Sequence, residues 1–374
     1  MDAAEHAVKG AVVCTGGLTL LQSLANRRVV SPSPLALSLG SFVGTFRFLE
    51  ALGRTHDKRD SAAPAAASTA AIVALFFLEA NRKGMVISYA AVEALISLAK
   101  EHTRLAEIKG IEMPLGTLVY ARIIHMWIYC SQYCSRSQLS TLDGLSHVSK
   151  DALSRMRVML PASNTVSRCQ VFHPMATCSQ FHRDFLLRNF KSSLKMFIPM
   201  YLLSSGVLQY KRWLSGPRPS LKGVLIQYLR SCACLTSVYA IPLASSCLLP
   251  IQNNRLAVTI SGSLAVLCLL VEHERRRVSV LKAISVYPIA ATATQVAEAL
   301  RLSEHRREYL QYVIFAASMG VIFQYPQHQG TRLVQWLYGH ALPVTQTHIE
   351  ATDNAEQEKQ TRDDVQTRNG SSTK

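Results

Sequence analysis

The sequence predicts an all-α fold, a multi-pass transmembrane helical bundle, on three observations. Hydrophobic residues make up 49% of the 374 residues and charged residues only 17%, below the roughly 25% usual in soluble domains. Lys and Arg, whose excess gives a formal charge of +16, fall mostly in short clusters between apolar runs of about 15–25 residues. Basic loops between such runs are typical of integral membrane proteins. A nucleic-acid-binding protein would gather its positive charge in patches on a polar surface, so no nucleic-acid partner is expected.

About ten apolar runs are candidate helices, and segments that contain Pro separate several of them. Some runs fall short of the roughly 17 residues that span a bilayer, so we expect about eight true spans, with the shorter runs tilted or interfacial. The candidate helices cover residues 10–25, 35–52, 65–80, 85–99, 115–134, 194–209, 222–249, 256–272, 278–300 and 309–325.

Two short matches indicate an internal repeat with about four helices in each copy. In one match a Tyr precedes a Gln-Tyr dipeptide at the same spacing, and in the other an apolar helix ends in Glu before a basic turn. The matched segments are 120–133 with 312–325, and 79–83 with 272–276. We therefore expect a first transmembrane repeat at 1–136, a basic polar linker at 137–168, a Cys/His-Pro box at 169–184, a second transmembrane repeat at 185–342 and a disordered polar tail at 343–374.

The sharpest chemical feature is the run Cys169-x3-His173-Pro174-x3-Cys178-x3-His182. Thiolate and imidazole are ligands that zinc prefers, and four of them in one short segment can hold a tetrahedral ion. The spacing matches no familiar zinc ribbon or finger, and the alternative is a juxtamembrane loop whose Cys and His side chains pack or face water. We therefore assign no metal or other cofactor, and keep Cys169, His173, Cys178 and His182 as candidate ligands only.

Gly40 and Gly44 form a small-xxx-small step inside an apolar run. Two glycines on one face let a neighbouring backbone approach closely, which is how helices associate in lipid. We expect helix packing at these positions.

Three ionisable residues, Glu93, Arg122 and His125, lie inside apolar runs. A charge at membrane depth is costly, so such groups normally face a bundle interior or a water-filled path. Arg122 and His125 share a helix face because they are three residues apart. These three residues are the candidate polar lining between the two repeats.

No sequence motif nominates an enzyme. The chain has no P-loop, no Gly-x-Ser-x-Gly elbow, no His-Glu-x-x-His motif and no dinucleotide fingerprint. Its nine Cys are irregularly spaced with no secretory signal before them, so no disulfide framework is expected. We predict that the protein is not itself an enzyme.

Several segments resemble the transmembrane protein 135 family. The run Cys169…His173-Pro174…Cys178, followed by Phe190-x4-Lys195-x3-Pro199-x-Tyr201-Leu202-Leu203, resembles the Cys-rich segment of that family. Residues 39–46, Leu-Gly-Ser-Phe-Val-Gly-Thr-Phe, resemble the start of its second four-helix unit. Residues 79–89 and 291–300 resemble the paired helices around the basic turn of the family.

The resemblance implies a multi-pass protein of peroxisomal or mitochondrial membranes, involved in organelle organisation and in fatty-acid or sterol handling. The family is distantly similar to mitochondrial inner-membrane translocases, which implies the alternative of a channel, a carrier or a protein-translocase-like component. Expected partners are the lipid bilayer, fatty-acid or sterol lipids, and a second copy of the chain or another membrane protein. Two further alternatives are a scaffold that acts through its linker and tail, and a membrane metalloenzyme built on the Cys/His-Pro box.

Overall fold

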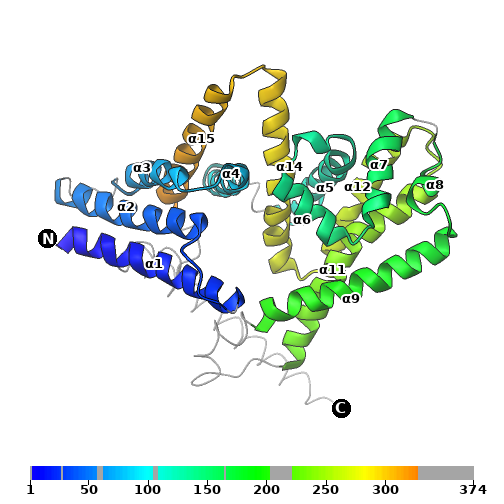
Figure 1. The fold of residues 1–374 in the computed structure, drawn as a ribbon, viewed down its shortest axis with the longest axis horizontal. Helices are drawn as coiled ribbons and strands as arrows, with labels where there is room; N and C mark the ends of the chain where they lie inside the picture. The colour runs from blue at the N-terminus through cyan, green and yellow to red at the C-terminus, as the bar shows by residue number, and fades with distance from the viewer. Residues whose placement is uncertain are drawn as a thin grey trace, which may run out of the picture. The chain divides into compact units, whose positions relative to one another are not determined.

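The computed structural model describes residues 2–26, 28–56, 62–103, 108–163, 166–202 and 221–326. Within these ranges the chain forms α-helices and short 3-10 turns, and none of the described residues lies in a strand (Figure 1). The all-α prediction is therefore confirmed for this part of the chain. The tail expected at 343–374 lies outside the described residues. Backbone contacts divide the chain into two compact units.

The first unit contains the N-terminal helices together with the end of α4 and most of α15. Helix α2 contacts both α1 and α3. The Ser68 hydroxyl of α3 donates to the Ala316 carbonyl of α15 at 2.9 Å, and the ring centroids of Phe46 and Phe323 are 4.6 Å apart. The helices of this unit are α1 (Asp2–Asn26), α2 (Pro34–His56) and α3 (Ala62–Phe76), together with the part of α4 (Ala80–His102) from Glu93 and the part of α15 (Glu304–Gln324) from Leu310.

Gly40 and Gly44 lie where α2 meets α1. A Cβ on Gly40 would overlap Thr15 Oγ1, and one on Gly44 would lie 3.0 Å from the Ala11 Cβ. The two helices therefore approach each other over the face that lacks side chains, which is the geometry that small residues permit.

The second unit is organised around α5, which contacts α7, α12 and α14, and around α11, which contacts α9, α12 and α13. Its best-buried side chains include Tyr120, Met126, Leu160 and Leu269. Helix α5, which carries Tyr120 and Met126, thus lies at the centre of the packing of this unit. The helices are α5 (Glu112–Tyr129), α6 (Arg136–Ser146), α7 (Lys150–Ala162), α8 (Arg168–Phe172), α9 (Cys178–Leu202), α11 (Leu221–Leu248), α12 (Asn254–Leu264), α13 (Cys268–Val271) and α14 (Glu274–Ala299).

Most of the segment expected as a polar linker, 137–168, folds into two capped helices, α6 and α7. Ser135 and Gln138 form a reciprocal capping box at the start of α6, which satisfies backbone N–H groups that have no partner within the helix. Asp143 of α6 accepts hydrogen bonds from Arg157 of α7 at 3.1 and 2.5 Å. Leu160 is fully buried in the core, so this segment is part of the helical packing.

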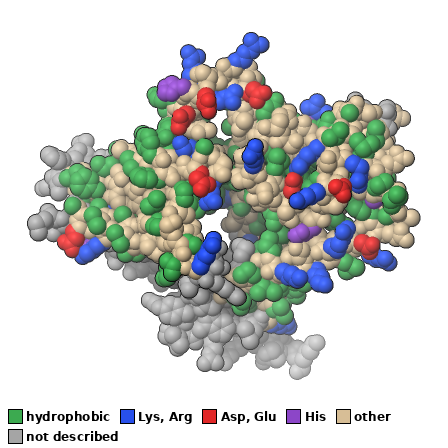
Figure 2. Space-filling model, in the orientation of Figure 1, with side chains coloured by type: hydrophobic (Ala, Val, Ile, Leu, Met, Phe, Trp, Pro, Cys, Tyr) green, Lys and Arg blue, Asp and Glu red, His purple; other side chains and the backbone are tan. Residues whose placement is uncertain are grey.

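Four segments of the described residues are long and apolar enough to cross a membrane: Pro34–Gly53, Lys222–Leu248, Asn254–Val271 and Arg276–Ala299. Many of their large apolar side chains are exposed, and hydrophobic side chains reach the surface across the face seen in Figure 2. A bilayer would cover such surface, so the chain has the features of a membrane protein. The repeat of two four-helix units is not shown by the structure and stays a prediction. The boundaries of the two compact units differ from those predicted for the repeats.

Candidate functional site

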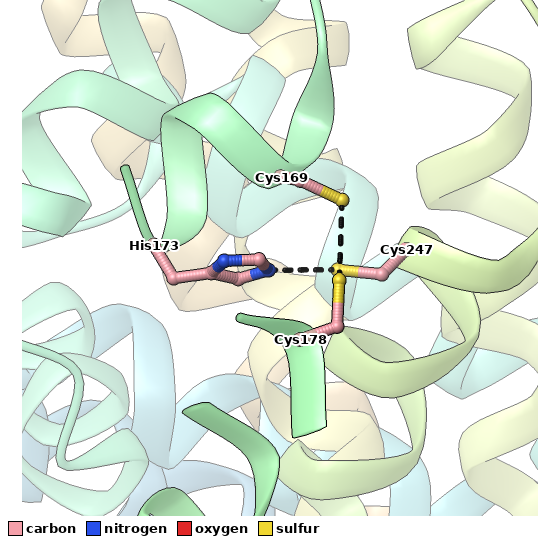
Figure 3. Close-up of side chains that lie close together, drawn as sticks. All are labelled: Cys169, His173, Cys178 and Cys247. Carbon is pink, nitrogen blue, oxygen red and sulfur yellow. Dashed lines mark hydrogen bonds between the residues drawn. The ribbon is translucent and has the colours of Figure 1, made fainter. Parts of the chain in front are cut away.

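Four side chains of the second unit point toward one another (Figure 3). Cys169 lies in α8, His173 caps its C-terminus, Cys178 begins α9 and Cys247 lies near the end of α11. Cys169 Sγ is 3.6 Å from Cys178 Sγ, and Cys247 Sγ is 3.6 Å from His173 Nε2. His173 is buried, the three cysteines are half-buried, and the four nitrogen and sulfur atoms all lie within 4.8 Å of one another. The three thiols are free. We refer to these four residues as the Cys3His cluster.

Local backbone signals explain why the first three residues of the cluster meet. Pro174 cannot continue a helix, so the chain turns directly after His173. Thr177 and Gln180 then form a reciprocal cap, with side-chain to backbone distances of 3.3 and 3.4 Å, and α9 begins at Cys178. The turn between the two helices therefore brings residues of α8 and α9 together.

Arg168, the residue before the first thiol of the cluster, holds α8 against the end of α11. Its guanidinium donates to the carbonyls of Ser246 at 2.6 Å, Leu249 at 2.5 Å and Ile251 at 2.6 Å. The carbonyls of a last helical turn lack intrahelical partners, and a cation is favourable at the negative end of the helix dipole. This clamp aligns Cys247 with the α8–α9 turn.

The hydrogen bonding of His173 fixes the role of its ring. Nδ1 lies 2.9 Å from the Ala176 carbonyl oxygen, and a carbonyl only accepts hydrogen bonds. Nδ1 therefore carries a hydrogen, which leaves the Nε2 lone pair directed at Cys247 in the neutral ring. Metal-binding histidines commonly have this arrangement, in which the second nitrogen donates to a backbone carbonyl.

His182, the fourth candidate ligand from the sequence, lies beside the cluster and not in it. Its ring centroid is 6.3 Å from that of His173, and its buried Nε2 has no hydrogen-bond partner among the described residues. Burial and the neighbouring His173 lower the pKa of His182. Cys247 is the fourth residue of the cluster instead. Its only signal in the sequence is a position at the end of an apolar run, far from the other three residues.

The residues expected as a polar lining have separate surroundings. In the second unit, Arg122 donates to Thr292 Oγ1 of α14 at 3.1 Å and also hydrogen-bonds Gln295 Oε1. His125 Nε2 instead accepts from Arg255 Nε of α12 at 3.0 Å. Glu93 belongs to the first unit, so the three residues do not form a lining within either unit.

An apolar cavity of about 70 Å³ lies between α5, α6, α11 and α14. Four aromatic rings contribute to its wall, those of Tyr120, Trp127, Tyr239 and Tyr287, and the remaining lining residues are Ile, Leu and Val. Helices α11 and α14 carry two of the four segments that are long enough to span a membrane. The cavity is therefore a small apolar space inside the second unit, and two candidate membrane-spanning helices contribute to its wall.

Comparisons with family models, with curated proteins and with solved structures found no match to this chain.

Proposed function

We propose that the chain is a multi-pass protein of peroxisomal or mitochondrial membranes that handles fatty-acid or sterol lipids and is not itself an enzyme. The membrane class rests on the four apolar helices. The choice of organelle and of lipid rests on the resemblance of the Cys/His-Pro box and of the Gly40–Gly44 helix to the transmembrane protein 135 family.

The observation that carries lipid handling is the apolar cavity. Apolar cavities of this kind exclude water and take up apolar guests, as a cavity of about 150 Å³ lined by aliphatic and aromatic residues takes up benzene. A space of about 70 Å³ accommodates only the end of an acyl chain or one edge of a sterol. The lipid would therefore insert a terminal apolar group into the space between α5, α6, α11 and α14, and leave its polar end outside the cavity.

Photocrosslinking of the full chain tests this proposal. Purified protein in detergent is labelled with a fatty acid and with a sterol that each carry a diazirine at the apolar end, and the labelled peptides are mapped by mass spectrometry. Val238 lines the cavity, and Val238→Phe fills it. Leu229 lies on the same helix and is 40% exposed, so Leu229→Phe is the matched control. We expect labelling of α5 or α11 that Val238→Phe removes and Leu229→Phe preserves. Labelling that is equal in both variants would contradict the proposal.

Localisation has its own test. Carbonate extraction of cell membranes should leave the protein in the pellet, and gradient separation should place it with peroxisomal or mitochondrial markers. Recovery with secretory-pathway markers would contradict the proposed organelle, while release into the supernatant would contradict the membrane class.

A channel or carrier is the second candidate, and the contacts of Arg122 favour it. A guanidinium that bridges α5 and α14 through Thr292 and Gln295 puts polar groups inside the second unit, as solute pathways require. In that case Arg122→Leu abolishes transport while the amount of folded protein stays the same.

A further inference from the structure

We propose that Cys169, His173, Cys178 and Cys247 bind one Zn²⁺ in a tetrahedral Cys3His site that joins the α8–α9 turn to the end of α11. The site is independent of the proposed lipid handling, because none of the four residues lines the apolar cavity.

The spacing of the four atoms suits a zinc ion. Bond lengths of about 2.3 Å to sulfur and 2.0–2.1 Å to nitrogen place the ligands of a tetrahedral ion about 3.8 Å (S–S) and about 3.6 Å (S–N) apart. The Cys169–Cys178 sulfur pair is 3.6 Å apart, and the pair of Cys247 Sγ and His173 Nε2 is also 3.6 Å apart. No pair in the cluster exceeds 4.8 Å, so movements of about 1 Å complete the tetrahedron.

The chemistry of the donor set selects the metal. Three thiolates and one imidazole are the ligands of structural zinc sites, whereas Mg²⁺ and Ca²⁺ prefer oxygen. All four positions come from the protein, which leaves no open position for a water or a substrate. A closed set of this kind stabilises a fold and does not catalyse a reaction.

The surroundings of the Cys3His cluster favour a negatively charged site. Zn²⁺ with three thiolates carries a net charge of −1. Cys178 stands at the N-terminus of α9, where the helix dipole favours a thiolate. The donation from His173 Nδ1 to Ala176 holds the imidazole ring with Nε2 toward the three sulfurs. The thiols and the imidazole thus supply the four ligands, and the Ala176 carbonyl supplies the outer contact that orients the ring.

Metal analysis of the full chain, purified in detergent without chelator, is the first measurement. We expect about one zinc per chain in the wild type. Removing a ligand should weaken zinc binding by at least the roughly 10–100-fold that outer-shell changes cost, so Cys247→Ser should lose the metal. Two controls should keep it: Cys14→Ser, a half-buried thiol of the first unit, and His182→Gln, which changes the neighbouring imidazole.

Cobalt substitution tests the site in the wild type. No substitution that could unfold the protein is involved, so an absent signal cannot come from a variant that fails to fold. The zinc is removed with chelator, Co²⁺ is added, and the visible spectrum is recorded. We expect the d–d bands of tetrahedral cobalt and a sulfur-to-cobalt charge-transfer band, both of which disappear when Zn²⁺ is added.

Three results would overturn the proposal. The first is a folded wild type that has no zinc and gives no tetrahedral cobalt spectrum. The second is a Cys247→Ser variant that retains zinc while His182→Gln loses it. That result would make His182, and not Cys247, the fourth zinc ligand. The third is a mass deficit of two hydrogens in the peptides of Cys169 and Cys178, which would show a disulfide in place of metal ligands.

Discussion

Replacement of Arg168 by Met tests how α8 is held against the end of α11, beside the Cys3His cluster. The side chain of Met retains the apolar stem and removes the guanidinium. The change takes away hydrogen bonds to the carbonyls of Ser246, Leu249 and Ile251 and to the Asn254 side-chain oxygen at 3.0 Å. The three carbonyls lose their charged donor, and α8 loses these hydrogen bonds to the end of α11.

The magnitude follows from the number and surroundings of these bonds. A hydrogen bond to a charged group contributes about 1.5–3 kcal/mol. Arg168 is half-buried, so water replaces part of what is lost, and we expect a total of about 3 kcal/mol rather than the full sum. In a domain of this size 1 kcal/mol corresponds to about 2–4 °C in the melting temperature, so the expected shift is about 6–12 °C.

Thermal unfolding of the full chain in detergent measures this shift. The matched control is Arg183→Met on α9, since the Arg183 side chain is 72% exposed and pairs only with the neighbouring Asp184 in the described contacts. Arg168→Lys should recover little stability, because one ammonium cannot donate to carbonyls that a planar fork reaches in several directions. Equal melting temperatures for Arg168→Met and Arg183→Met would refute the reasoning.

Three further substitutions test packing within the units. Gly262→Ala should lower the free energy of unfolding by about 1–3 kcal/mol, because its Cβ would lie 2.9 Å from the Ile124 Cβ; Gly144→Ala, which meets open space, should be neutral or stabilising in the same melting assay. Phe46→Ala should cost about 3–5 kcal/mol, because the ring is fully buried, and a cost below about 1 kcal/mol would count against this core. Arg122→Leu should reduce the yield of folded protein on size-exclusion chromatography, because two hydrogen bonds to α14 are lost; an unchanged yield would favour a role in a solute path.

The helical class could be predicted from the sequence because apolar runs of helical length dominate it. Helices α6 and α7 were missed for the opposite reason. Their buried residues, such as Leu142, Leu153 and Leu160, are scattered among polar ones, so a search for continuous apolar runs passes over them. The signal was present in the Ser135-x-x-Gln138 capping box, which marks a helix start without any apolar run.

The candidate site could be predicted in part. Cys169, His173 and Cys178 fall within one short segment, and local turn chemistry alone brings them together. Cys247 comes from a distant apolar helix, and its place in the cluster depends on the tertiary contact between Arg168 and the end of α11. Spacing along the chain instead favoured His182, one helical turn beyond Cys178, whose ring packs against His173.

The Arg168 clamp also imposes an order on biosynthesis. Ser246, the first of its carbonyl partners, follows Arg168 by 78 residues, which a ribosome adds in roughly 4–16 s at 5–20 residues per second. During that interval the Arg168 guanidinium lacks its carbonyl partners at the end of α11, and the thiols of the α8–α9 turn lack Cys247. The clamp therefore forms only after the end of α11 has been synthesised, while α12, α13 and α14 of the same unit are still to follow.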